Sequence, residues 1–446
     1  MPFCVQEEIH MGKFTYRTPG ALLDAAKAAG YDLPFSEDLS VLAAPVTVEG
    51  SNVTLKNRLT VHPMEGFDST LDGAPGELTI RRCDRFAAGG AGLIWLEATT
   101  VVEEGRTSEG QLWLHEGNAD KFKALAERMH RMSDGTPLIL QLTHSGRFSR
   151  PHNTPAPVIS YHNPLMNEKM MIDPDYPVVT DEYLDTLPEI FGKAAKLAKD
   201  AGFDGVDIKC CHKYLFSELL SAYNREGRYG GSFENRARLF FDSIEAASVW
   251  ADRDFILASR LGLYDCLPYP WGFGADRDDY LQIDWEEPEK LLMGAYNRGI
   301  RLVDMTLGSP YINPHVNRPY DSGGYEPPEE RMTGVARLLD AAAHMKKICP
   351  GITMIGTGYS YLRQFAPQVA AAAVQKGMTD AAGFGRMAFA YPDFAKDILE
   401  KGELDTRKVC LTCSKCTAMM RKIHATGCPI RDREVYTPMY KELFSE

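Results

Sequence analysis

The sequence predicts an α/β fold, a (β/α)8 TIM barrel with an N-terminal extension and a C-terminal cysteine-cluster segment. Three observations predict it. Short apolar segments alternate with longer helical patterns, the alternation repeats eight times, and ionisable residues gather where the apolar segments end. A doubly wound open sheet is the alternative. It needs a glycine-rich phosphate fingerprint after its first strand, and neither Gly89–Gly92 nor Gly356–Gly358 completes one.

Length and charge narrow the class of protein. A chain of 446 residues fits one barrel with extensions. The net charge of −12 is spread along the chain, and no basic stripe suggests nucleic acid or an anionic membrane. The N-terminus lacks the pattern of a signal peptide, and no apolar run is long enough to span a bilayer, so we expect a cytoplasmic location. We expect residues 1–50 to be the extension, 51–402 the barrel and 403–446 the cysteine segment.

The eight predicted strands are apolar and about five to nine residues long. They are Arg58–Met64, Gly92–Thr100, Leu138–Thr143, Gly205–Cys210, Phe255–Leu261, Leu302–Leu307, Thr353–Gly358 and Ala381–Arg386. Helical patterns lie between them. They cover Pro75–Ala88, Asn118–Met132, Asp181–Ala201, Ser232–Ala251, Glu286–Arg298, Thr333–Lys347, Leu362–Lys376 and Asp393–Lys401, with one more at Ala21–Ala29. Thr180 is a good N-cap for the third of these helices.

Polar side chains lie where these strands end, which is where TIM barrels carry their active sites. They include Gln141, Lys209, His212 and Arg260. A ring of such hydrogen-bond donors suits a flat, electron-rich heterocycle that gains negative charge on reduction. Glycines and an arginine at the ends of the last two strands suit a phosphate group. A heterocycle with a phosphate tail describes FMN.

Several motifs strengthen this interpretation, and they occur in one order along residues 50–430. They are Asn57–Met64, Gln141–Arg147, Gly205–Arg238, Gly356–Gly358 and Gly385–Arg386. With them the chain resembles the Old Yellow Enzyme family of FMN-dependent NADH:flavin oxidoreductases. More narrowly, it resembles the iron–sulfur branch that contains 2,4-dienoyl-CoA reductase and the bile-acid enoate reductases.

The resemblance implies roles for residues around the flavin. Pro63, Met64 and Ala98 would pack on the isoalloxazine ring, and Gln141 would pair with its pyrimidine edge. Arg260 would approach N1 and O2, and Glu65 would lie beside the C4 carbonyl and N5. Gly358, Gly385 and Arg386 would hold the phosphate.

The resemblance also implies catalytic residues. Tyr214 matches the tyrosine that delivers a proton to the α-carbon of the substrate, and Lys209 and His212 match the pair that grips the substrate carbonyl oxygen. Lysine replaces the family's usual histidine, so it adds a charge beside the flavin, pairs with an acidic substrate, or pairs with a carboxylate such as Glu97 or Glu65. His212 could instead be a hydrogen-bonded support, and Tyr214 a core aromatic residue. We expect His144 to have a structural or flavin-edge role.

Four cysteines near the C-terminus, Cys410, Cys413, Cys416 and Cys428, form two C-x₂-C steps and a distant Cys-Pro. This spacing resembles a ferredoxin-like [4Fe–4S] ligand set, although the third cysteine stands one residue earlier than in dienoyl-CoA reductases. A Cys₄ zinc site is the alternative.

The leading hypothesis is an FMN-dependent ene-reductase that reduces an activated C=C bond of a small unsaturated substrate. Electrons would come through the cluster from a separate reductase or ferredoxin, or from NAD(P)H. The alternatives are a dehydrogenase that oxidises an amine or alcohol, and a non-catalytic subunit or redox sensor. Under each of the three hypotheses the protein could form a homo-oligomer. Long loops after strands five and six carry aromatic residues that form either pocket walls or a barrel cap.

Overall fold

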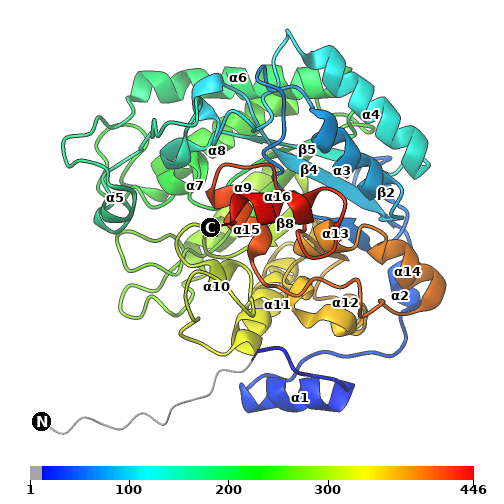
Figure 1. The fold of residues 1–446 in the computed structure, drawn as a ribbon. Coiled ribbons are helices and arrows are strands. Elements are labelled where there is room, and N and C mark those ends of the chain that lie inside the picture. The colour runs from blue at the N-terminus through cyan, green and yellow to red at the C-terminus, as the bar shows by residue number, and fades with distance from the viewer. Residues whose placement is uncertain (1–12, 446) are drawn as a thin grey trace, which may run out of the picture.

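The computed structural model describes residues 13–445, so Cys4 and the first part of the predicted extension lie outside the described residues. Eight parallel strands form a closed barrel in the order β10-β3-β4-β5-β6-β7-β8-β9, which confirms the predicted TIM barrel (Figure 1). The strands are β3 (Leu59–Val61), β4 (Leu93–Thr100), β5 (Leu138–Thr143), β6 (Gly205–Ile208), β7 (Ile256–Gly262), β8 (Ile300–Thr306), β9 (Thr353–Gly356) and β10 (Ala381–Phe384).

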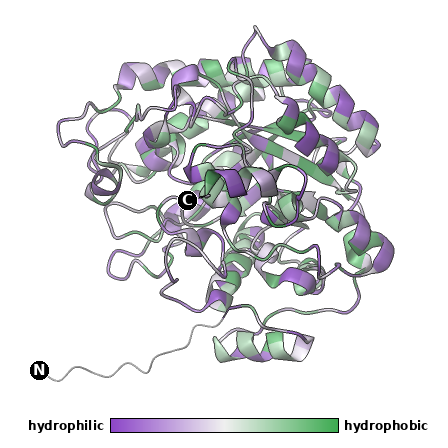
Figure 2. Ribbon diagram, in the orientation of Figure 1, coloured by the Kyte–Doolittle hydropathy of each residue, from purple (hydrophilic) through white to green (hydrophobic). Residues whose placement is uncertain are grey.

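Helices surround the barrel and turn hydrophilic residues outward (Figure 2). The main ones are α3 (Glu77–Ala87), α4 (Ala119–Ser133), α6 (Asp181–Asp200), α8 (Phe233–Ser248), α9 (Glu286–Asn297), α11 (Arg331–Ile348), α12 (Ala366–Gln375) and α14 (Phe394–Lys401). The helix α1 (Pro19–Ala28) lies outside this ring beside α11. Thr180 caps α6, accepting a hydrogen bond from Tyr183 N at 3.2 Å.

Apolar side chains fill the interior of the barrel at its amino end. Leu93, Trp95, Ile139, Ile256 and Leu302 belong to one buried cluster there. The hairpin of β1 (Val46–Thr47) and β2 (Thr54–Leu55), which the sequence did not predict, packs against this cluster and closes that end. The opposite end, where the strands have their carboxyl termini, is therefore the one available for a ligand.

Several strands are shorter at their carboxyl ends than predicted. The ladder stops at Val61, Ile208, Gly356 and Phe384, because the residues that follow leave the barrel wall and turn toward its mouth. The predicted helix 362–376 is also divided. A 3₁₀ segment, η3 (Tyr359–Phe365), precedes α12, since Arg363 adopts a φ of 51° to reach Asp321 and the Leu411 carbonyl.

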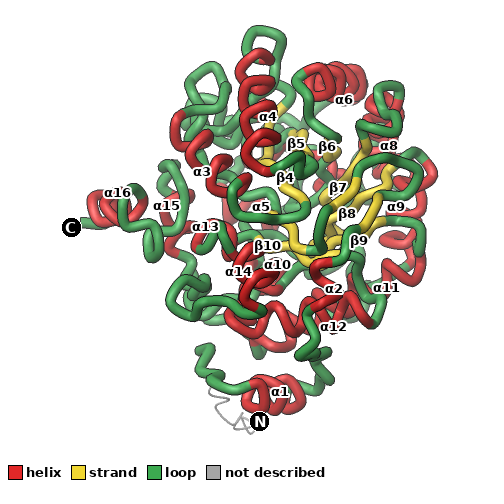
Figure 3. Tube along the Cα trace, turned by 90° about the vertical axis from the view of Figure 1, so that its right-hand side faces the viewer, coloured by secondary structure: helices red, strands yellow, loops and turns green. Residues whose placement is uncertain are grey.

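The C-terminal segment covers the mouth of the barrel. Its helices α15 (Lys415–Arg421) and α16 (Tyr436–Leu443) lie in front of the strands in Figure 1 and to one side of them in Figure 3. Asp432 anchors this segment through ion pairs with Arg81 and Arg85 of α3, at 2.6 and 2.7 Å. Within residues 13–445, no helix has the length and apolarity that crossing a bilayer requires.

Candidate active site

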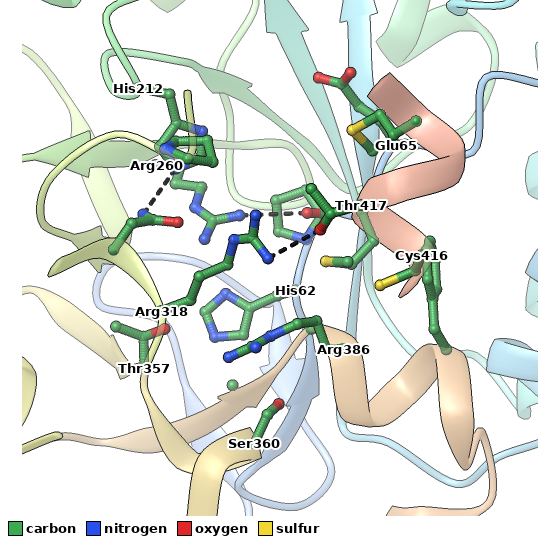
Figure 4. A pocket seen from close by; sticks show the side chains of 18 of the residues that line it. His62, Glu65, His212, Arg260, Arg318, Thr357, Ser360, Arg386, Cys416 and Thr417 are labelled. Atoms are coloured by element: carbon green, nitrogen blue, oxygen red, sulfur yellow. Dashed lines mark hydrogen bonds between the residues drawn. The ribbon is translucent and has the colours of Figure 1, made fainter. Parts of the chain in front are cut away.

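One cavity of about 1000 Å³ opens at the carboxyl ends of the strands, beneath α15 (Figure 4). It is lined by every predicted catalytic and flavin-contacting residue except one. These are Pro63, Met64, Glu65, Gln141, Lys209, His212, Tyr214, Arg260, Gly358, Gly385 and Arg386. The exception is Ala98, which is buried in β4 and whose carbonyl accepts a hydrogen bond from Gln111 at 3.2 Å. The structure therefore does not bring Ala98 to this surface.

A tight turn after β6 places two of the catalytic candidates. His212 and Lys213 both have positive φ, 66° and 60°, a conformation that side-chain-bearing residues adopt at a cost of about 1–3 kcal/mol each. Lys213 stabilises the turn, because its ammonium group donates hydrogen bonds to Ser221 at 2.5 Å and to Asp265 at 2.6 Å. The turn lets both His212 and Tyr214 reach the cavity.

Glu65, Lys209, Tyr214 and Tyr311 form a connected polar network in the wall of the cavity. The Tyr214 hydroxyl donates to Glu65 Oε1 at 3.0 Å and lies 2.8 Å from the Tyr311 hydroxyl. Lys209 Nζ lies 3.7 Å from Glu65 Oε1 and 3.8 Å from the centre of the Tyr214 ring. Of the two partners considered for Lys209, the structure selects Glu65, since Glu97 is bound by Arg82 and by the Gly66 amide.

Burial determines the protonation states of Tyr214 and His212 in the cavity. It raises the pKa of Tyr214 well above its ordinary value, and the nearby Glu65 carboxylate raises it further, so the hydroxyl keeps its proton. Burial, with the positive charges of Arg260 and Lys209, lowers the pKa of His212 well below its ordinary value. His212 is thus a neutral imidazole at physiological pH, and Asn317 Nδ2 lies 3.3 Å from its Nε2.

Two buried aspartates, which the sequence analysis did not identify, bond to residues that line the cavity. Asp207 accepts hydrogen bonds from Gln141 at 2.5 Å, Trp95 at 2.9 Å and the Arg260 amide at 2.7 Å. Asp304 lies 2.6 Å from His62 Nδ1 and 3.3 Å from Arg260 Nε. Both aspartates lie inside buried strands. An ionisable residue within an apolar strand is costly unless it is paired, so this pattern could have identified them from the sequence.

The position of the His62 ring is fixed by the residues packed around it. A Cβ atom added at Gly383 would lie 1.6 Å from His62 Nε2, so only glycine allows this approach. His62 was part of a motif quoted for the family resemblance, but it was given no role.

The opposite end of the cavity is rich in positive charge. Gly358 has a φ of 95°, which favours glycine there, and Arg386 donates to the Pro319 carbonyl at 2.8 Å. Arg318, which the sequence analysis did not single out, donates to Thr417 at 3.0 Å. Figure 4 shows Arg318 and Arg386 in this cavity. Burial and the nearby Arg386 and Arg421 lower the pKa of Arg318 to about 10.

The residues present fit FMN. Within residues 13–445, three buried polar atoms of this cavity have neither a hydrogen-bond nor an ion-pair partner: His62 Nε2, Glu65 Oε2 and Arg386 Nη1. A cavity at the carboxyl ends of barrel strands with convergent polar groups is typical of a cofactor site. Donors at the Gln141 and Arg260 end suit a flavin ring edge, and Arg386 and Ser360 suit a phosphate.

The four C-terminal cysteines line one smaller cavity with an empty volume of about 360 Å³ next to the first. Cys410 Sγ accepts a hydrogen bond from the Thr412 amide at 3.3 Å, and burial raises the pKa of Cys410 to about 11. In the part of the chain that the structure describes, no three His, Cys, Asp or Glu side chains are arranged to hold a metal ion. The iron–sulfur assignment therefore stays a prediction.

The two aromatic loops have different roles. Tyr311, from the loop after β8, lines the cavity and stacks on Phe148, with ring centres 4.0 Å apart. Aromatic residues of the loop after β7 pack elsewhere: Trp271 stacks on Tyr161, and the Tyr264 hydroxyl donates to the Tyr280 carbonyl. The loop after β8 thus forms a wall of the cavity, and the loop after β7 supports the surrounding structure.

His144 has the structural role expected for it. Its Nδ1 accepts from the Gly146 amide at 2.9 Å and its Nε2 lies 2.9 Å from the Tyr183 hydroxyl, so the ring is held in one neutral tautomer. Burial lowers the pKa of His144 to about 4. The unfolded chain takes up this proton near pH 6.5, and the folded chain does so only near pH 4.

We therefore expect this histidine to contribute stability above pH 6.5 that is lost as the pH falls toward 4, by about 3 kcal/mol in all. His144→Asn keeps an acceptor for Gly146 and should lose less stability over the same range. Urea denaturation of both proteins at pH 7.5 and 5 measures the difference. Equal pH dependence in the two proteins would contradict the assignment.

The fold, the strand-end cavity and its donor set define a flavin-dependent oxidoreductase. Residues 42–269 match the model of the NADH:flavin oxidoreductase / NADH oxidase family, and the chain belongs to that family. NADPH dehydrogenase from Listeria welshimeri is 32% identical over 263 residues, which cover 58% of this chain and 71% of that protein.

Solved structures agree on the fold. The 2-naphthoyl-CoA reductase complex with 2-naphthoyl-CoA superimposes with a TM-score of 0.72 at 21% identity, over 90% of this chain. The chain spans 58% of the length of that reductase. An Old Yellow Enzyme homologue from Zymomonas mobilis gives a TM-score of 0.61 at 21% identity and covers 82% of this chain and 94% of its own.

Proposed function

We propose that the protein is an FMN-dependent ene-reductase that reduces an activated C=C bond of an enone, enoate or enoyl thioester. The observation that carries the proposal is the Tyr214 hydroxyl, which keeps its proton and lines the cavity beside Lys209 and His212. A proton donor beside two groups that can polarise a carbonyl is the arrangement that reduction of a conjugated alkene requires.

The residues of this chain have separate tasks in that reaction. When bound, FMN supplies the hydride that the β-carbon receives. Lys209 and the neutral His212 polarise the substrate carbonyl, and Tyr214 holds the proton for the α-carbon. Glu65 positions both Lys209 and Tyr214, since its Oε1 faces the two side chains. Gln141, Arg260, Gly358, Gly385 and Arg386, which line the cavity, would bind the cofactor, and Pro63 and Met64 would pack against it.

The electron supply is part of the proposal. We infer that Cys410, Cys413, Cys416 and Cys428 hold a [4Fe–4S] cluster, which their shared cavity beside the phosphate end supports. NADPH as the donor is supported by relatives named NADPH dehydrogenase. A separate reductase or ferredoxin would be the donor if the cluster accepts electrons first.

Charge argues against the opposite direction with an amine substrate. Histamine dehydrogenase from Rhizobium shares the fold, with a TM-score of 0.66 at 20% identity. A cationic amine in the present cavity would meet four cationic side chains and one carboxylate, that of Glu65. The four are Lys209, Arg260, Arg318 and Arg386. That electrostatic environment favours neutral or acidic substrates.

Two measurements on one anaerobic sample test the proposal. The visible spectrum should show flavin bands with a broad iron–sulfur shoulder, and the NADPH-reduced enzyme should be reoxidised by members of a panel of enones, enoates and CoA thioesters. Reduction of the oxidised enzyme by histamine, with no response to any alkene, would contradict the proposed direction. A colourless, zinc-containing protein would contradict an enzymatic role altogether.

A further inference from the structure

A second cavity, of about 720 Å³, adjoins the active-site cavity. The two share wall residues, namely Pro310, Tyr311, Arg318, Thr417 and Met420. The remaining lining residues belong to the second cavity alone, and they are Phe67, Thr107, Phe148, Arg150, Arg421 and Ile423. Tyr311 stands between the two spaces, since its hydroxyl meets Tyr214 on one side and its ring stacks on Phe148 on the other. A ligand long enough to pass Tyr311 would occupy both.

The second cavity carries positive charge without compensation. Arg150, Arg318 and Arg421 line it, and no Asp or Glu among the described residues does. In residues 13–445 the guanidinium groups of Arg150 and Arg421 have no hydrogen-bond or ion-pair partner, and the only side-chain bond of Arg318 goes to the neutral Thr417. Lys169 lies close enough for Arg421 to lower its pKa, which extends the positive region.

These three arginines differ in this respect from three buried arginines elsewhere in the chain. Arg82, Arg147 and Arg236 are buried, and each is paired with at least one carboxylate. The chain as a whole carries a net charge of −12, so acidic residues are plentiful. Three neighbouring arginines with no acid beside them repel one another, and a bound anion would relieve that repulsion.

The walls of the second cavity indicate the shape of its ligand. Phe148 and Tyr311 stack with an interplanar angle of 20°, and Phe67 adds a third aromatic side chain. Flat apolar walls with a charged rim suit a molecule with an apolar body and an acidic end.

We propose that the cavity lined by Arg150, Arg318 and Arg421 is an anion-binding subsite for the alkene substrate. The subsite holds a carboxylate or phosphate group carried beyond Tyr311 from the reacting bond. The inference rests on the proposed ene-reductase function, and it narrows the substrate class to alkenes with a distal acidic group.

Matched probes test the subsite. 4-Carboxybenzylideneacetone carries a distal carboxylate, its methyl ester is neutral, and crotonyl-CoA carries distal phosphates. Arg150→Gln and Arg421→Gln should each raise the KM for one of the two anionic probes about fivefold to tenfold, and raised ionic strength should do the same. The KM for the methyl ester should not change. Whichever anionic probe responds identifies carboxylate or phosphate as the ligand.

Two controls separate charge from fold. Arg421→Lys keeps the positive charge and should recover most of the affinity. Lys422→Gln removes a neighbouring charge on a residue that does not line this cavity, and it should behave as wild type. FMN content of each variant confirms that the active-site cavity is intact.

Binding is also measured without turnover, by titrating each probe into the oxidised enzyme and following the flavin absorbance. Weaker binding of an anionic probe to the two Gln variants, with no alkene reduced, would support the subsite and contradict the ene-reductase proposal. Turnover of all three probes that is unaffected by both variants would overturn the subsite alone. A raised KM for NADPH with unchanged KM values for the probes would assign the arginines to the electron donor and would also overturn it.

Discussion

Tyr214→Phe should lower alkene turnover by about 10²–10⁴-fold while leaving reduction of the enzyme by its electron donor unchanged. The substitution removes only the hydroxyl, which bonds Glu65 at 3.0 Å and lies 2.8 Å from the Tyr311 hydroxyl. The ring stays packed against Phe148, so the fold and the flavin site should be preserved. Stopped-flow absorbance separates the two half-reactions.

Tyr311→Phe is the matched control for this prediction. Tyr311 reaches the same hydroxyl from the outer side of the cavity, so its loss should slow proton delivery less than the loss of Tyr214 does. Unchanged alkene turnover in Tyr214→Phe would refute the assignment of the proton donor. A larger effect in Tyr311→Phe would transfer that role to Tyr311.

Arg147→Met should lower the free energy of unfolding by about 3–5 kcal/mol, although Arg147 does not line the active-site cavity. Both Arg147 and Glu218 are fully buried, and the guanidinium bonds Glu218 Oε1 at 2.5 Å, Asn167 at 2.5 Å and the Tyr161 carbonyl at 2.7 Å. Its removal would leave Glu218 buried with its negative charge unpaired. Urea denaturation followed by circular dichroism measures the loss.

The double variant Arg147→Met/Glu218→Gln should recover part of that stability, because it removes the unpaired charge. Lys290→Met breaks the exposed pair with Glu286 on α9 and should cost at most about 0.5 kcal/mol. A loss in Arg147→Met no larger than that of this surface control would show that the buried pair is not needed for stability.

The active-site residues could largely be predicted because strand ends are encoded locally. Each short apolar segment is followed by its own polar residues, and a parallel barrel brings all such ends to one mouth. Lys209, His212 and Tyr214 therefore reached the cavity as expected. Ala98 does not line the cavity, and it lies where the register between β4 and β5 shifts, between Leu96 and Thr99, an irregularity that the strand pattern did not predict.

Partners between distant segments could not be predicted in the same way. Glu65 and Glu97 were both candidates for Lys209 in the sequence, and the choice depended on the ion pair between Arg82 of α3 and Glu97. Asp304 pairs with His62 across the barrel, at a separation of 242 residues. Such contacts depend on how helices and strands pack, so they cannot be predicted from the sequence pattern of a single segment.

The sequence by itself determined the barrel, the order of its strands and the family, because hydrophobic alternation and the quoted motifs are properties of consecutive residues. Only the tertiary structure decided which charges meet. It paired Glu65 with Lys209 and Tyr214, and it gathered Arg150, Arg318 and Arg421 from three separate loops and helices around one cavity. Electrostatic interactions depend on distance and burial, and folding sets both.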